Sequence, residues 1–117
     1  MAATPLQALA QQSVHDAALA AGVRVATITE LEQMLSRGSG AQRVTVLYEV
    51  NCTLSRGFFP ALVELAREQG PRGVAFVAYN TNADPADLGV VPAFLREFDA
   101  PFEARWIQGW RMDEGRG

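Results

Sequence analysis

Two short apolar runs of strand-forming residues, separated by one long helical segment, constrain the fold of this 117-residue chain more than any other feature. The first run, residues 44–50, is rich in β-branched and aromatic residues. The second, residues 74–79, is continuously apolar, which is typical of a strand covered on both faces. Between them, residues 53–69 carry a broad apolar face at helical spacing, and a Gly-Pro-Arg-Gly sequence breaks the pattern. Strand, helix, strand is the pattern of a parallel α/β core. In such a core, the junction between the first run and the helix lies at the carboxyl end of a central strand.

The N-terminal part predicts one more helix and one more strand before a second helix. Residues 4–21 are predicted to be helical and to end at Gly22. Residues 23–28 alternate between apolar and polar side chains, which indicates a short strand. Thr29 and Glu32 have the spacing of a capping box, so we expect the second helix to begin there and to end at the following Gly-Ser-Gly.

The segment after the second apolar run allows two interpretations. Apolar residues recur at helical spacing, which favours a helix that begins near Pro92. Alternatively, Pro92 opens a strand over residues 93–98. The helix is preferred, because a buried strand would have to bury Arg96 and Glu97. Residues 102–110 then form a last strand or extended segment.

The composition bounds the class of protein. A chain of 117 residues with 49% apolar and 20% charged residues is typical of one soluble globular domain. The net charge of -3 argues against nucleic-acid binding, and no apolar run approaches the ~20 residues that span a bilayer. No positively charged segment precedes an apolar one at the N-terminus, so no signal peptide is predicted. We expect a cytoplasmic protein, or a periplasmic one if a leader has been removed.

The chain has a single cysteine, Cys52, where the first apolar run ends and the long helix begins. One cysteine cannot form an internal disulfide, and no cofactor or metal is expected. Asp84 and Asp87 form an acidic pair, but their surroundings have a common loop composition, so no metal is assigned to them. The only histidine, His15, is expected to be exposed on the N-terminal helix rather than to act as a catalytic base.

The strand-to-helix junction around Cys52, here called the thiol corner, resembles that of the thioredoxin superfamily, and most closely its TlpA/ResA-like branch. The resemblance covers roughly residues 43–107 and rests on Cys52 after an apolar strand, Pro60 in the following helix and Asp84-Pro85 after the second strand. It implies a three-layer α/β domain with a central mixed sheet and helices on both faces. The predicted domain spans residues 23–112, after an N-terminal helical extension (1–22) and before a frayed tail (113–117).

The chain also departs from the family pattern. Ser55 stands where the family has its second cysteine, and Asn51 stands where an aromatic residue usually precedes the first. Under the strand interpretation, Pro92 would correspond to the family's cis-proline, and Asn51 and Pro92 would then contact a substrate. Under the helix interpretation, Pro92 starts a helix. The usual C-terminal part of the family has no counterpart.

Three roles remain open for Cys52. In the first role, Cys52 is a monothiol nucleophile, and Ser55 and Arg56 stabilise its thiolate. In the second, it is the relic of such a nucleophile in a binding subunit. In the third, it is a small residue that fills a gap in the packing. Without a second thiol, a mixed disulfide at Cys52 cannot resolve internally. The preferred function is therefore a protein-binding or assembly component, and the alternative is a monothiol thiol–disulfide oxidoreductase. A nearby Glu49 is expected to be solvated at the strand end rather than to transfer protons.

Four apolar residues gather near the C-terminus within nine positions: Phe102, Trp106, Ile107 and Trp110. If this patch is open, it predicts a homo-oligomer or docking on a protein partner. Alternatively, the N-terminal helix folds over the patch and covers it.

Overall fold

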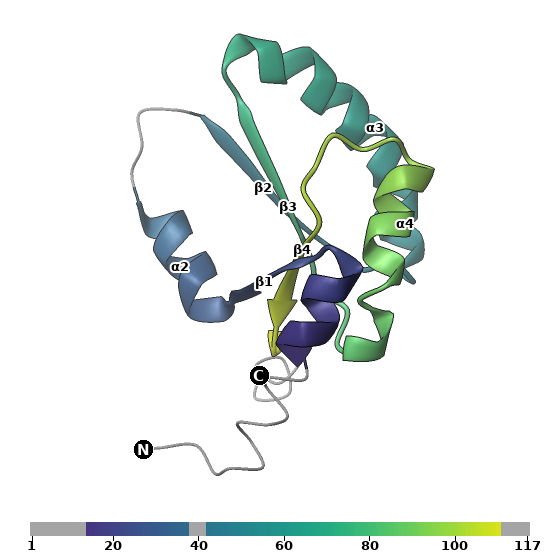
Figure 1. The fold of residues 1–117 in the computed structure, drawn as a ribbon. Helices are drawn as coiled ribbons and strands as arrows, with labels where there is room; N and C mark the ends of the chain where they lie inside the picture. The colour runs from purple at the N-terminus through teal and green to yellow at the C-terminus, as the bar shows by residue number, and fades with distance from the viewer. Residues whose placement is uncertain (1–13, 38–41, 111–117) are drawn as a thin grey trace.

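The computed structural model describes residues 14–37 and 42–110 (Figure 1). A helix over residues 14–21 comes first. It is followed by β1 (Arg24–Thr27), α2 (Ile28–Ser36), β2 (Arg43–Tyr48), α3 (Thr53–Gln69), β3 (Ala75–Asn80), α4 (Val90–Glu97) and β4 (Arg105–Gln108), with short 3₁₀ helices at Gly70–Arg72 and Pro85–Asp87. The predicted α/β class and the alternation of strands and helices are confirmed, and the predicted bounds of α3 are those observed.

The four strands form one sheet in the order β1-β4-β3-β2, and each pair of neighbours is parallel. The expectation of a mixed sheet is therefore wrong for the described residues. The reason lies in the segment between β3 and β4, which forms α4 rather than a strand. A helical crossover returns the chain to the amino end of the sheet, so β4 enters parallel to β3. The helix interpretation is thus correct, and the helix begins two residues before Pro92, at Val90.

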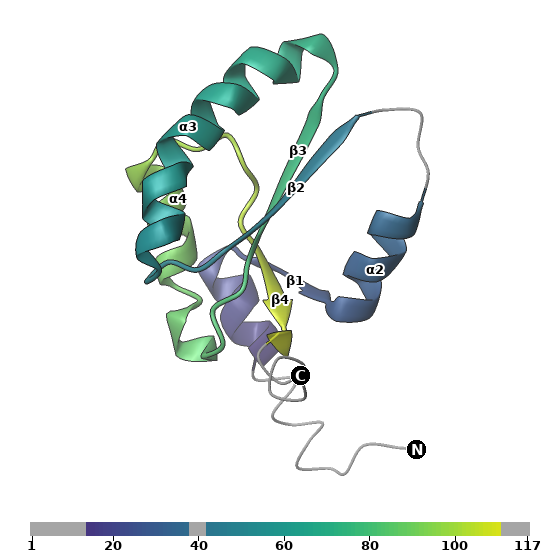
Figure 2. The ribbon, with the colours of Figure 1, turned by 180° about the vertical axis from the view of Figure 1, so that it is seen from behind.

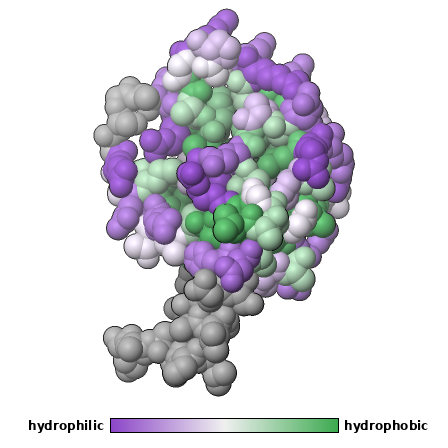
Figure 3. Space-filling view, viewed as in Figure 1, coloured by the Kyte–Doolittle hydropathy of each residue, from purple (hydrophilic) through white to green (hydrophobic). Residues whose placement is uncertain are grey.

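Helices cover both faces of the sheet. Figures 1 and 2 show α3 and α4 on one side of the strands and α2 on the other. Two buried clusters match these two faces. The larger cluster contains Phe59 from α3, Phe94 from α4 and Ala18 from the N-terminal helix, and the smaller contains Leu31 from α2. Figure 3 shows hydrophobic residues across the middle of the face seen in Figure 1, interrupted by a hydrophilic group, with mostly hydrophilic residues around the rim.

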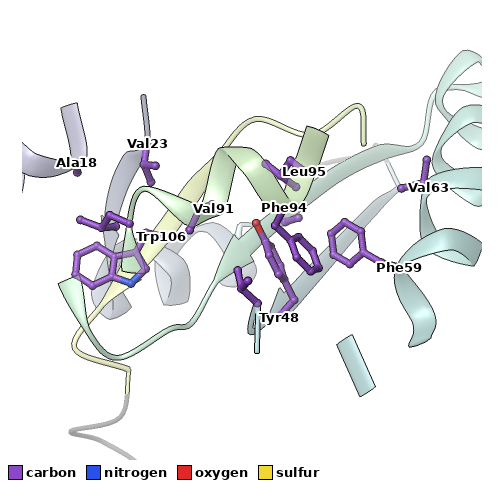
Figure 4. Packing of buried hydrophobic residues seen from close by; sticks show 12 residues of the cluster. Ala18, Val23, Tyr48, Phe59, Val63, Val91, Phe94, Leu95 and Trp106 are labelled. Carbon is purple, nitrogen blue, oxygen red and sulfur yellow. The ribbon is translucent and has the colours of Figure 1, made fainter. Parts of the chain in front are cut away.

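An aromatic cluster joins β2 to the two helices above it. The Tyr48 ring stacks on Phe94 at 5.4 Å between centroids and meets the edge of Phe59 at 5.0 Å (Figure 4). Phe59 and Phe94 are themselves in edge contact at 4.8 Å. Because aromatic pairs add to the free energy of area burial, this cluster holds α3 and α4 against the end of β2.

The second predicted helix begins earlier than the capping box indicated. Its N-cap is Thr27, whose Oγ1 accepts a hydrogen bond from the Glu30 N–H at 3.1 Å, and Thr29 lies inside the helix. An N-cap needs extended backbone, which Thr27 has as the last residue of β1. Glycines 38 and 40, where the helix was expected to end, lie outside the described residues, as do residues 4–13 of the first predicted helix.

Candidate functional site

The Cys52 corner follows the carboxyl end of β2. The chain turns between Glu49 and Cys52, and the Cys52 N–H donates to the Glu49 carbonyl at 3.3 Å. Cys52 is the N-cap of α3 and is half-buried. The placement of the thiol at the start of a helix, after a parallel strand, is therefore confirmed. The expectation that this strand is central is wrong, because β2 is an edge strand in the described sheet.

The start of α3 stabilises the thiolate form of Cys52. Hydrogen bonds from the backbone N–H groups of Ser55 and Leu54 lower the pKa of the Cys52 thiol, and the Ser55 hydroxyl adds a smaller contribution. Partial desolvation and the negative charge of Glu49 raise the same pKa, but the net shift is downward. The corner thus favours a thiolate mainly through backbone groups.

Ser55 occupies the second position of the motif and is buried. Its Oγ accepts a hydrogen bond from the Glu49 N–H at 3.1 Å. The hydroxyl therefore stabilises the turn that precedes Cys52, a role that does not require redox chemistry.

Arg56 is directed toward α4. Its Nε donates to the Val50 carbonyl at 3.2 Å, and its Nη1 is 2.7 Å from Oε2 of Glu97. The guanidinium also lies over the ring of Phe94, 5.2 Å from the centroid. A planar guanidinium suits a carboxylate and an aromatic face together. Arg56 therefore joins α3 to α4, and its role as a charge that stabilises the Cys52 thiolate stays a prediction.

A buried polar network lies beside the corner, at the carboxyl end of β3. Asn82 Oδ1 accepts hydrogen bonds from the Val50 N–H and from Nδ2 of Asn80, each at 2.9 Å. The Asn82 N–H donates to Asn80 Oδ1 at 3.0 Å, and Thr81 donates to the Tyr48 carbonyl through both its N–H and its hydroxyl. All three residues of this Asn-Thr-Asn sequence are buried. The network ties the turn before Cys52 to the loop after β3.

From the sequence alone, residues 80–85 have the composition of a loop, which does not indicate a buried network. The available signal was a run of amide and hydroxyl side chains directly after a continuous apolar strand, the position where parallel sheets bring loop residues together. Trp106 extends the network from β4, because its Nε1 donates to the Asn82 carbonyl at 2.7 Å.

The two acidic residues of the following turn have structural partners. Asp84 caps the short 3₁₀ helix by accepting from the Ala86 N–H, and Asp87 accepts from Nδ2 of Asn82. Within residues 14–37 and 42–110, no group of three or more His, Cys, Asp and Glu residues could hold a metal ion.

The C-terminal aromatic segment is largely buried. Trp106 and Ile107 are 2% and 0% exposed, so the interface expected there is wrong for these two residues. The reason is that β4 lies between β1 and β3, where successive side chains are buried on opposite faces. Trp106 belongs to the larger cluster together with Ala18 of the N-terminal helix, as the alternative interpretation expected. Phe102 and Trp110 are half-buried against the two clusters.

The two expected substrate contacts lie on different elements. Asn51 is exposed in the turn before Cys52, whereas Pro92 is half-buried as the third residue of α4. The described residues contain no cis peptide bond, so Pro92 is not a cis-proline.

His15 is exposed, as expected, and lines a cavity of about 460 Å³ between the N-terminal helix and β1. The lining of this cavity includes no residue of the Cys52 corner.

In the part of the chain that the structure describes, no helix is both long and apolar enough to cross a membrane. Comparison of the chain with protein-family models, with curated proteins and with solved structures found no match.

Proposed function

We propose that this chain is a thioredoxin-like protein-binding or assembly component with an incomplete redox motif. The observation that carries the proposal is an apolar stripe on the outer surface of α3, which begins two residues after Cys52. Leu54, Phe58 and Leu65 are 79%, 39% and 43% exposed, and their spacing places them on one side of the helix. Large apolar side chains gathered on one exposed helix side favour a protein partner.

The motif itself supports binding over catalysis. Its second position is the buried Ser55, whose hydroxyl is engaged with the Glu49 N–H. A dithiol–disulfide cycle needs a second thiol to release a mixed disulfide, and this chain has one cysteine. Cys52 on its own cannot complete that cycle.

A second candidate function is monothiol thiol–disulfide exchange. It is favoured by the lowered pKa of the half-buried Cys52 thiol. In this reaction the Cys52 thiolate attacks a substrate disulfide and releases one substrate thiolate. A glutathione thiolate then attacks the substrate sulfur of the mixed disulfide, so the S–S bond to Cys52 breaks and Cys52 leaves as the thiolate. A second glutathione attacks the resulting glutathione–substrate disulfide, which releases the substrate thiolate and forms glutathione disulfide.

Two measurements separate these functions. In the reduction of insulin by dithiothreitol, the wild type and Cys52→Ser should both give the uncatalysed rate. Robust turnover by the wild type alone would favour the exchange enzyme. A glutathione-coupled assay extends the test to an external resolving thiol.

The binding surface is tested with immobilised protein and an extract of the source cells. The wild type and Cys52→Ser should retain the same proteins, and the double variant Phe58→Gln/Leu65→Gln should lose them. Neither Phe58 nor Leu65 supplies an N–H group to the thiol, so the variant leaves Cys52 and its donors Leu54 and Ser55 in place. Retention that instead depends on Cys52 and is reversed by dithiothreitol would contradict the binding proposal.

A further inference from the structure

We infer that the free edge of β2 and the apolar stripe of α3 bind a second copy of this chain, through antiparallel pairing of two β2 strands about Thr45. The inference rests on the proposed binding function and identifies its partner. The edge of β2 and the stripe replace the C-terminal aromatic segment, in which Trp106 and Ile107 are buried, as the surface for self-association.

The first observation is the direction of the backbone groups of β2. Among the described strands, β2 is at the edge of the sheet next to β3. The carbonyls of Gln42 and Tyr48 accept from N–H groups of Ala75 and Thr81, on the β3 side. Because backbone groups alternate in direction along a strand, the even-numbered residues of β2 face β3. The N–H and C=O groups of Arg43, Thr45 and Leu47 therefore point away from β3, toward the free edge.

The second observation fixes the register. The Glu49 N–H donates to Ser55 Oγ, so the row of outward backbone groups ends at Leu47. The three outward residues are symmetric about Thr45. In a two-fold antiparallel pair, Thr45 faces Thr45 of the second copy, and Arg43 faces Leu47. Each of these pairs can exchange both of its N–H···O=C hydrogen bonds. A second copy presents the same three outward residues, so a two-fold axis closes the pair and leaves none of these outward backbone groups unpaired.

The side chains of β2 are compatible with this pairing. The strand contains no Pro, Gly or bulge that would protect its edge, and its only charged residue is Arg43. In the Thr45-centred register, β-branched residues lie beside one another, since Val44 faces Val46 of the second copy. Arg43, whose Nη1 donates to the Met34 carbonyl, faces Leu47 of the other copy, two residues before Glu49, so the nearest charge across the pair is of opposite sign.

The third observation is the orientation of α3. Arg56 and Arg67 form ion pairs with Glu97 of α4 and with Asp99 just after it, so this side of α3 faces α4. Helical spacing places the stripe of Leu54, Phe58 and Leu65 about 180° around the helix from these arginines. The stripe therefore faces away from α4, past β2 and toward the proposed two-fold axis. The stripes of the two copies would approach each other above the paired strands, where they exclude water from the new hydrogen bonds.

The molar mass of the full-length protein, measured by light scattering and sedimentation over a range of concentrations, tests the inference. The wild type should double its mass as the concentration rises. Thr45→Pro removes the central outward N–H, leaves the β3 hydrogen bonds in place and should weaken the dimer at least tenfold. Thr45→Val is the matched control and should remain dimeric. A wild type that is monomeric at every concentration would overturn the inference.

Two further variants keep the test valid if Thr45→Pro does not fold. Phe58→Glu on the stripe should give a folded monomer, whereas Leu19→Glu, on the exposed surface of the N-terminal helix, should leave the dimer unchanged. A dimer that resists Phe58→Glu would assign self-association to another surface and overturn the inference.

Disulfide trapping in a Cys52→Ser background tests the register. Residues in a directly opposed, hydrogen-bonded antiparallel pair have Cα atoms about 5.5 Å apart, which a disulfide can span. Thr45→Cys should therefore give a covalent dimer on mild oxidation, whereas Leu47→Cys, which faces Arg43 of the other copy, should not. A Leu47→Cys dimer without a Thr45→Cys dimer would contradict the register.

If the wild type is monomeric but Phe58→Gln/Leu65→Gln still loses other captured proteins, the inference fails and the proposed function stands.

Discussion

The backbone N–H of Val50 donates a hydrogen bond to Oδ1 of Asn82 over 2.9 Å, although the two residues are 32 positions apart. This bond fastens the turn before Cys52 to the loop that follows β3. The thiol corner therefore depends on the buried amide of Asn82, which lies outside the Cys52 motif.

Asn82→Ala should lower the free energy of unfolding by about 2–4 kcal/mol, because it leaves the Val50 N–H and Asn80 Nδ2 as buried donors without an acceptor. Urea denaturation measures this change. Asn51→Ala, at an exposed position in the neighbouring turn, is the matched control and should change stability by less than about 0.5 kcal/mol. Equal losses in the two variants would contradict a special role for the buried amide.

Tyr48→Phe should leave the protein equally stable or stabilise it by up to about 1 kcal/mol. The Tyr48 hydroxyl is buried and has no hydrogen-bond partner among the described residues, and burial raises its pKa, so it stays protonated. The substitution removes the hydroxyl but keeps the ring against Phe59 and Phe94. Tyr79→Phe, which loses a hydrogen bond to Met34 Sδ, is the control and should be slightly destabilising. A loss of more than about 1 kcal/mol in Tyr48→Phe would mean that this hydroxyl has a partner.

The rate of alkylation of Cys52 by iodoacetamide should follow a pKa below the ~8.5 of a free cysteine. The N–H groups at the start of α3 stabilise the thiolate more than Glu49 and partial burial disfavour it. Glu49→Gln removes the negative charge and should lower the apparent pKa further. Glu64→Gln, an exposed residue in the middle of α3, is the control and should leave the pKa unchanged. An unshifted pKa in the wild type would refute the stabilised thiolate and the monothiol candidate with it.

Arg56→Ala should lower the free energy of unfolding by about 1–2 kcal/mol while it leaves the pKa of Cys52 nearly unchanged. The guanidinium contacts Val50, Glu97 and Phe94, and the ion pair is partly exposed, so the ion pair itself adds little. Arg56→Lys keeps the charge but not the planar geometry, and should recover only part of the loss. A large rise of the thiol pKa in Arg56→Ala would instead support a direct contact between Arg56 and the thiolate.

The elements with strong local signals were predictable. The bounds of α3 were correct because its start follows a strand-to-helix corner and its end is marked by Gly70 and Pro71, both of which are local features. The choice of a helix around Pro92 was correct because Arg96 and Glu97 would be costly to bury in a strand. The start of α2 was wrong because Thr27 and Thr29 are equally good caps in isolation. The end of β1 decided between them.

The sequence by itself determined the alternation of strands and helices, the α/β class and the position of a single sulfur at the start of a helix. Each of these depends on periodicity and breaking residues within a few turns of chain. Only the tertiary structure decided which strands are neighbours, because strand order depends on packing between residues far apart in sequence. That order buries Trp106 and Ile107 between β1 and β3 and leaves β2, the strand that leads to Cys52, at the edge.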